Sequence, residues 1–186
     1  MPAGVHAPYG LGRPVTNSLI METNYRNTIA GLWLLSLSLA MVSCNSSLTY
    51  NKAIQKNIKR ADNPELHDDA RFIVEAASFN MLATQMAEEA AKSGYSNSLV
   101  TLAKSNLERH KDMRRQLKRV ARKSKMVMPG EMSEDHQQLL SQLKSSDRRE
   151  FDRTYIRIMR DITAKDSEIF SKMATAGQNE EVRSFA

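Results

Sequence analysis

The sequence predicts an all-α fold: an up-and-down helical bundle of about four helices, placed behind an N-terminal leader and a flexible tether. The 186 residues include only 7 glycines and 5 prolines, while helix-favouring Ala, Leu, Met, Glu, Lys and Arg are abundant. After residue 64, apolar residues recur at alternating steps of three and four, which is typical of amphipathic helices. The single cysteine excludes an internal disulfide, so packing must stabilise the fold.

The N-terminal region contains an apolar run at residues 29–43, which follows Arg26 and directly precedes Cys44. Its length of about 15 residues is short for a bilayer span, which needs roughly 20. The pattern resembles a bacterial lipoprotein signal, in which the cysteine is lipidated after cleavage. We therefore expect residues 1–43 to be a cleaved leader, with Met21 as the suspected true start, and Cys44 to be the lipid attachment site. The alternative is a buried core helix with an incidental cysteine.

A polar, serine- and asparagine-rich segment follows, and residues 44–63 show no sustained periodicity. We interpret this segment as the lipidated N-terminus and tether, and residues 64–186 as the bundle domain. Asn63 suits the N-cap of the first helix, and Pro64 suits its first position. The apolar stripe of this helix continues until Gly94, which should end it.

Two helices should follow this first one. Ser96 is a suitable cap for the second helix, which is expected to stop before Pro129 and to form an antiparallel hairpin with the first. Ser133 is expected to open a shorter third helix that carries leucines 139, 140 and 143. Short connections of this kind favour an up-and-down arrangement of neighbouring helices.

The last long helix has signals at both ends. Asp147, followed by Glu150 three residues later, imitates a capping box. The helix should then run to Gly177, and residues 179–186 could add one more turn or two. The domain is thus expected to hold three long helices and a short one.

Several segments resemble one known family. The most specific is Phe151-Asp-Arg-Thr-Tyr155, and it is accompanied by residues 72–90 and by Leu99-Val-Thr-Leu-Ala103 followed by His110. Together they resemble an exported bacterial ferritin-like family of unknown function, whose members are often labelled outer membrane proteins. The resemblance covers roughly residues 71–186. It implies a ferritin-like bundle in the cell envelope, which we expect at the outer membrane, facing the periplasm.

The sequence departs from that family at polar positions inside the expected bundle. Ala83 stands where members carry glutamate, Thr163 stands where they carry histidine, and only His110 matches. Di-iron bundles also need Glu-x-x-His motifs, and this sequence has none. We therefore expect no metal and no cofactor. His110 is interpreted as a buried polar position, hydrogen-bonded to a neighbour in the core.

The sequence does not favour an enzyme. It contains neither a Gly-x-Ser-x-Gly nucleophile elbow nor a glycine-rich phosphate loop. The acidic pairs at 68–69, 88–89 and 180–181 are adjacent in sequence, so their side chains diverge on a helix and cannot share a proton.

Positive charge is concentrated in the expected second helix. Residues 104–125 contain ten cations and two acids, whereas the whole chain has a net charge of +6. One arc of this helix carries the candidate anion-binding residues Lys111, Arg115, Lys118 and Arg122. The alternative is a solvated helix whose cations pair with acids on neighbouring helices, and the candidate acids are Glu75, Glu88, Asp161 and Asp166. Nucleic acid is an unfavoured partner, because the leader implies export and aromatic residues do not interleave with the basic ones.

These observations predict a lipid-anchored protein of the bacterial cell envelope with a structural or binding role. Its expected contacts are the membrane through the lipid, and an anionic lipid, lipopolysaccharide or envelope protein through the basic helix. The alternative function is that of a degenerate ferritin-like protein that still binds a metal or another ligand inside the bundle.

Overall fold

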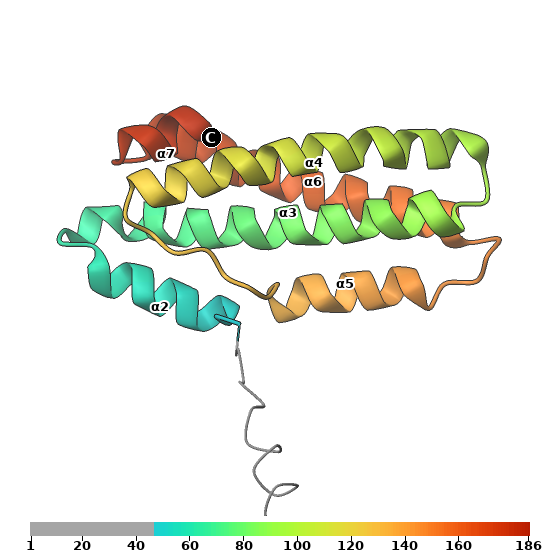
Figure 1. Ribbon diagram of the computed structural model, residues 1–186, viewed down its shortest axis with the longest axis horizontal. Helices are drawn as coiled ribbons and strands as arrows, with labels where there is room; N and C mark the ends of the chain where they lie inside the picture. Colours follow the sequence, from blue (N-terminus) through green and yellow to red (C-terminus); the bar gives the residue numbers. More distant parts are fainter. Residues whose placement is uncertain (1–46) are drawn as a thin grey trace, which may run out of the picture. The chain divides into compact units, whose positions relative to one another are not determined.

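A computed structural model describes residues 47–186, which belong to one compact unit that spans Ser46–Ala186. The all-α prediction is confirmed for this part of the chain (Figure 1). Its elements are α2 (Tyr50–Arg60), the 3-10 helix η1 (Pro64–Leu66), α3 (His67–Ser93), α4 (Asn97–Lys123), α5 (Glu134–Lys144), α6 (Phe151–Ala176) and α7 (Glu180–Phe185). The leader and Cys44 lie outside the described residues.

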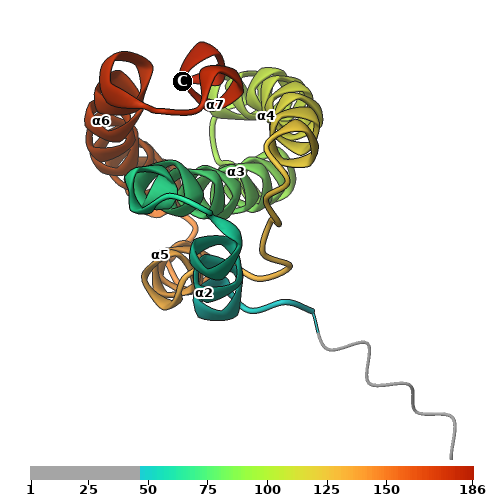
Figure 2. The same cartoon turned by 90° about the vertical axis from the view of Figure 1, so that its left-hand side faces the viewer.

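Helix α3 occupies the centre of the unit and is buried on several sides. Figure 2 shows α4 and α6 on either side of it, with α7 between them at one end, while α2 and α5 cover the remaining side. Along that side, α2 and α5 follow one another, so two short helices share the position that one long helix would fill (Figure 1). The expected three long helices and one short one are present, and α2 is an additional short helix.

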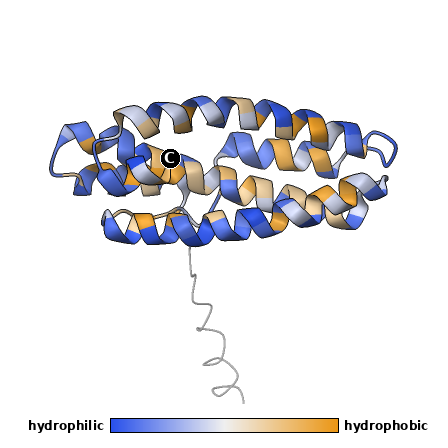
Figure 3. Cartoon of the chain, turned by 90° about the horizontal axis from the view of Figure 1, so that it is seen from above, coloured by the Kyte–Doolittle hydropathy of each residue, from blue (hydrophilic) through white to orange (hydrophobic). Residues whose placement is uncertain are grey.

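Buried side chains form two clusters that extend along the bundle. One cluster includes Phe79, Met86 and Tyr155, and the other includes Phe72 and Leu117. Figure 3 shows apolar and hydrophilic residues alternating along the helices, as amphipathic helices require. Among the described residues, the two clusters join side chains of α3, α4, α5, α6 and α7, so the compact unit Ser46–Ala186 has a core of its own.

The predicted boundaries of the first helix are confirmed. Asn63 accepts a hydrogen bond from the Glu65 amide at 3.0 Å, and Pro64 opens η1, which leads directly into α3. At the other end, the Gly94 amide donates to the Ala90 carbonyl at 3.0 Å. A Cβ atom at residue 94 would lie 2.6 Å from that carbonyl oxygen, so only glycine fits the close approach.

The serine caps of the next two helices are also confirmed. The Leu99 amide donates to Ser96 Oγ at 3.2 Å, and the His136 amide donates to Ser133 Oγ at 3.3 Å. Helix α4 ends at Lys123, and the chain then passes through Lys125 with a φ of 55°. A lysine thus occupies the left-handed position that usually selects glycine after a helix.

The capping box expected at Asp147 and Glu150 is wrong, because α6 begins only at Phe151. The Glu150 amide donates to the Asp147 backbone carbonyl at 2.9 Å, so these residues form a turn before the helix. The Glu150 side chain makes no capping hydrogen bond. The other end agrees with the prediction, since Gly177 follows the last residue of α6 and α7 supplies the expected extra turns.

The tether expected over residues 44–63 is wrong for its central part, because Tyr50–Arg60 form helix α2. The buried Asn57 side chain holds this helix to the α4–α5 connection: its Oδ1 accepts from the Val127 amide at 2.7 Å, and its Nδ2 donates to the Val127 carbonyl at 2.9 Å. At the start of α2, the Gly130 amide donates to the Leu48 carbonyl at 2.7 Å. Hydrogen bonds to a distant segment therefore fix a stretch whose own apolar surface is small.

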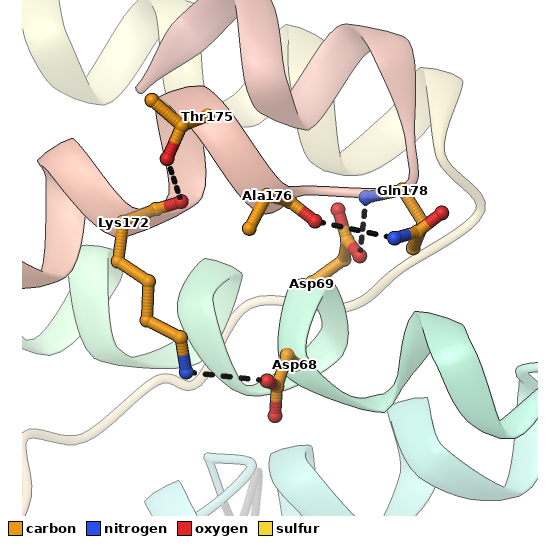
Figure 4. Close-up of polar contacts among 6 residues, drawn as sticks. All are labelled: Asp68, Asp69, Lys172, Thr175, Ala176 and Gln178. Atoms are coloured by element: carbon orange, nitrogen blue, oxygen red, sulfur yellow. Dashed lines mark hydrogen bonds and ion pairs between the residues drawn. The ribbon is translucent and has the colours of Figure 1, made fainter.

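A buried aspartate fixes the turn between α6 and α7 onto α3 (Figure 4). Asp69 accepts hydrogen bonds from the Gln178 and Asn179 amides, both at 3.1 Å. Beside it, Lys172 of α6 lies 3.4 Å from Asp68 at the surface. Within residues 47–186, no helix is long and apolar enough to span a bilayer.

Candidate functional site

The four predicted anion-binding residues lie on one exposed face of α4, which we call the α4 basic face. Its members are Lys111, Arg115, Lys118 and Arg122, spaced at steps of four, three and four along the helix, and all four are exposed. Helical geometry keeps residues at these steps on one side, so the side chains form a continuous stripe. Helix α4 buries other positions, such as Leu117 and Ala121, in the core.

Two of these cations pair with acids on α4 itself. Lys111 Nζ lies 2.7 Å from Glu108 Oε1, and Arg115 contacts Asp112. The Lys111 bond lowers the pKa of the Glu108 carboxyl. In the described part of the chain, neither Lys118 nor Arg122 has an acidic partner within 4.0 Å. The α4 basic face therefore carries two exposed cations, Lys118 and Arg122, that no acid in the described part of the chain pairs with.

The acids suggested as partners on neighbouring helices do not pair with α4. Glu75 accepts the Tyr50 hydroxyl, Asp161 pairs with Arg160 at 2.9 Å, and Asp166 is buried. Glu88 has no ion pair among the described contacts. One α4 cation does reach another helix, since Lys123 lies 2.8 Å from Glu181 of α7. The geometry thus disfavours charge neutralisation between helices as the purpose of the basic stripe.

The Phe151-Asp-Arg-Thr-Tyr155 element serves to hold helices together. Phe151 and Tyr155 are buried, and Asp152 reaches the N-terminus of α4, where it accepts from the Tyr95 amide at 2.8 Å and from the Ser96 amide at 2.9 Å. Burial acts to raise the pKa of Asp152, but hydrogen bonds from Ser96 and Tyr95 hold it below its ordinary value. The Tyr155 hydroxyl accepts a long hydrogen bond of 3.5 Å from Asn106.

His110 lies at the α3–α4 interface and is half-buried. Its ring meets Phe79 edge to face, with 5.9 Å between the ring centroids, and burial lowers the pKa of its imidazole. Its backbone carbonyl accepts from Asn80 Nδ2 at 2.8 Å. Within residues 47–186, however, His110 Nδ1 and Asn80 Oδ1 are buried without hydrogen-bond partners. The ring hydrogen bond that we expected from the sequence is therefore not formed at Nδ1.

A group of polar residues that the sequence did not single out lies beside the middle of α3, where α2 and α5 both begin. We call it the mid-bundle polar cluster, and it comprises Tyr50, Glu75, Ser78, Ser133, His136 and Asp166. The Tyr50 hydroxyl donates to Glu75, which ties α2 to α3. Ser78 Oγ lies 2.7 Å from His136 Nδ1 and accepts from the Ser133 amide at 2.9 Å, which ties α5 to α3.

The protonation of this cluster is shifted by its surroundings. Asp166 of α6 is only 5% exposed, and its Oδ2 has no partner among the described residues. Burial and the nearby Glu75 carboxylate raise the pKa of Asp166 to about 7, although Lys165 opposes this shift. Burial is also the main factor that lowers the pKa of His136. The cluster thus combines a neutral imidazole with a carboxyl group that titrates near neutral pH.

The cluster has no geometry for nucleophilic catalysis. Ser78 is fully buried although it contacts His136, so its hydroxyl cannot reach a substrate. In the described part of the chain, no group of three His, Cys, Asp or Glu side chains is placed to hold a metal ion. Of the two positions at which we expected a departure from the family, Ala83 is in the core and Thr163 is exposed.

Sequence reasoning missed the cluster because its members come from four helices. Ser78 and His136 are 58 residues apart, and Tyr50 and Glu75 are 25 apart, so no local spacing connects them. One signal was present: Ser78 and Glu75 interrupt the mostly apolar centre of α3. A polar residue in such a helix must find a partner on another element.

Residues 52–186 match the domain of unknown function DUF4142, a match that begins inside α2 and covers more than half of the chain. No curated protein and no solved structure matches the chain. The expectation of a family of unknown function agrees with this finding. The chain belongs to the DUF4142 family.

Proposed function

We propose that this protein is a lipid-anchored, ferritin-like bundle of the bacterial cell envelope, with a binding or structural role, and that the α4 basic face contacts anionic surfaces. The observation that carries the proposal is the exposed charge of α4, because Glu75 is hydrogen-bonded to Tyr50, Asp161 is paired with Arg160 and Asp166 is buried. The lipoprotein-like signal that ends at Cys44 supports the anchor. We place the protein at the outer membrane, facing the periplasm.

The proposed contact is electrostatic and should depend on salt. Each cation held near an anionic membrane contributes about 1 kcal/mol, and this attraction decays within a Debye length of about 8 Å at physiological ionic strength. Four cations on one face would therefore give measurable binding at low salt and weaker binding at high salt. Phospholipid headgroups and lipopolysaccharide phosphates share this chemistry.

Binding to vesicles tests the proposal. A fragment of residues 46–186, which lacks the anchor, is mixed with phosphatidylcholine vesicles and with vesicles that also contain phosphatidylglycerol or lipopolysaccharide. We expect binding to the anionic vesicles only, and weaker binding when Lys111, Arg115, Lys118 and Arg122 are all changed to glutamine. Circular dichroism should show unchanged helix content. Equal binding by the parent and the quadruple variant would contradict the role of the α4 basic face.

The anchor needs a separate test. Cells that express the full chain are labelled with radioactive palmitate, and the mature N-terminus is identified by mass spectrometry. We expect label on Cys44 and none on a Cys44→Ser variant. An unmodified cysteine in the parent protein would refute lipidation and leave the α4 proposal unaffected.

A degenerate ferritin-like protein that binds a metal or small ligand is the second candidate. Unpartnered buried polar atoms favour it, namely Asn80 Oδ1, His110 Nδ1 and Asp166 Oδ2. Such atoms in a native interior call for an explanation, and an internal water or ligand would provide one. Elemental analysis of protein purified without chelators tests the metal form of this candidate, since it requires a stoichiometric transition metal.

A further inference from the structure

Helix α2 has an unusual charge pattern. It contains Lys52, Lys56, Lys59 and Arg60 and no acidic residue. All four cations are exposed, and within residues 47–186 none of them has an acidic partner within 4.0 Å. Solvated helix faces usually mix both signs of charge. A helix that carries one sign only is therefore a candidate contact surface for an anionic partner.

These cations share one outward surface. The opposite face of α2 is occupied by Ala53 and Asn57, which are buried against the rest of the unit. A continuous surface patch is lined by Asn51, Lys52, Gln55, Lys56, Lys59 and Arg60, and no acid lines it. Glu131, Glu134 and Asp135 line a different surface pocket together with Tyr50. We call the patch the α2 basic face.

The chain just before α2 is fixed to the folded unit. Ser47 Oγ donates to Glu131, and the Leu48 carbonyl accepts from the Gly130 amide at 2.7 Å. Three peptide units separate Ser47 from Cys44, and an extended chain of that length covers at most about 11 Å. A lipid on Cys44 would therefore hold Ser47 within about 11 Å of the membrane that contains the lipid, and α2 begins three residues later at Tyr50.

Helix α4 does not share this position. Figures 1 and 2 show α2 beneath α3 and α4 above it, so the two basic helices lie on different sides of the central helix. A chain anchored just before α2 places α2, rather than α4, nearest to the anchoring membrane. The two basic faces are thus suited to different contacts.

We propose that the α2 basic face is a second anion-binding surface, which lies on the anionic phospholipid membrane that holds the anchor and leaves the α4 basic face free for another anionic surface. The orientation rests on the proposed lipid anchor. The affinity of α2 for anionic lipid rests only on its own exposed charge.

The test uses residues 46–186 and four proteins: the parent, an α2 variant, an α4 variant and their combination. The α2 variant carries Lys52→Gln, Lys56→Gln and Lys59→Gln, and the α4 variant is the quadruple change described above. A matched control, made in the α4 variant, removes three exposed cations that lie outside α2 and α4, through Arg148→Gln, Arg149→Gln and Arg157→Gln. Affinity is measured for phosphatidylglycerol-containing and for pure phosphatidylcholine vesicles.

In the α4 variant, where α2 is the remaining basic face, the three α2 changes should lower the affinity for anionic vesicles about 100-fold, because each lost cation contributes about fivefold. The control should lose much less affinity relative to the α4 variant, and the combined variant should bind anionic vesicles no better than neutral ones. A combined variant that binds anionic vesicles like the α4 variant, or like the control, overturns the proposal. If the α4 variant binds like the parent while the α2 variant does not, the α4 proposal fails and the present one stands.

A second measurement does not depend on removing charge. The only tryptophan of the chain is Trp33, so Gln55→Trp places a single reporter on the α2 basic face of the fragment. In the α4 variant background, brominated phosphatidylglycerol should quench this tryptophan when vesicles are bound. Binding without quenching overturns the proposal, because it shows that another surface faces the lipid.

Discussion

Replacing Asp166 by asparagine should stabilise the protein, and more strongly as the pH rises. Asp166 is buried, its Oδ2 has no partner among the described residues, and the pKa of its carboxyl is raised from 3.8 to about 7. A pKa that is higher in the folded state means that folding favours the protonated carboxyl. The contribution of this group to stability is therefore fully present below about pH 4 and is lost as the pH rises through 7.

The magnitude follows from the size of the shift. A displacement of about three units corresponds to about 4 kcal/mol at 1.36 kcal/mol per unit. Because Asp166 keeps 5% exposure, water screens part of this cost, so we expect about 2–4 kcal/mol at pH 8. Asparagine cannot ionise, and Asp166→Asn should therefore unfold at nearly the same urea concentration as the parent near pH 4, and at a clearly higher one at pH 8.

The assay is urea unfolding of residues 46–186 at several pH values between about 4 and 8, followed by circular dichroism. Titration of His136 affects the parent and the variant alike, so it cancels in their difference. Asp161→Asn is the matched control, because Asp161 lies on the same helix but is exposed beside Arg160. If the difference between Asp166→Asn and the parent does not change with pH, the carboxylate is not buried in its charged form and the reasoning is refuted.

Three further predictions concern stability. Phe151→Ala should lower the free energy of unfolding by about 3–5 kcal/mol, because it removes a ring that is only 5% exposed. Ile156→Ala on the same helix, where the side chain is 50% exposed, should change the melting temperature little, and equal effects of the two changes would place Phe151 outside the core. Lys125→Gly should raise the free energy of unfolding by about 0.5–1 kcal/mol, because glycine adopts the φ of 55° without strain. A lower melting temperature would show that the lysine side chain stabilises the fold by more than its backbone strain destabilises it. Tyr50→Phe should lower the free energy of unfolding by about 1–3 kcal/mol and accelerate amide hydrogen exchange in α2, because Glu75 loses the hydrogen bond from the Tyr50 hydroxyl. Unchanged exchange would show that this bond does not hold α2 to α3.

The parts of the fold that could be predicted from the sequence are those determined by local chemistry. Ser96 and Ser133 cap helices because a serine oxygen bonds an amide three residues away, and Gly94 ends a helix because a side chain would collide with the preceding turn. Long amphipathic helices also reveal their buried faces through spacing alone. These features need no knowledge of the rest of the chain.

The parts that could not be predicted depend on distant residues. Helix α2 buries little apolar surface, and its buried Asn57 is satisfied by Val127, which lies 70 residues further along the chain. The capping box at Asp147 failed for a related reason, since the true start of α6 is set by Phe151 in the core and by Asp152 at the N-terminus of α4. Local pattern reading therefore placed the α6 start too early and missed α2 entirely.

The candidate site shows the same division between local and distant information. The α4 basic face was predictable because four cations at helical spacing must share a face, and the structure exposes all four. The mid-bundle polar cluster was not predictable, because Glu75 and His136 meet their partners only after α2, α5 and α6 have packed on α3.

The Phe151-Asp-Arg-Thr-Tyr155 element, on which the predicted family resemblance mainly rests, serves the fold, and this directs the search for function to the surface. Phe151 and Tyr155 are buried, and Asp152 is used by the amides at the start of α4. None of the three is therefore free to bind a partner. The side chains that do not contribute to packing include exposed cations, and in the described part of the chain these are concentrated on α2 and α4. Substitutions that remove this charge do not alter the core, so they can test binding without unfolding the protein. Substitutions in the Phe151–Tyr155 element cannot do so, because they would change folding as well.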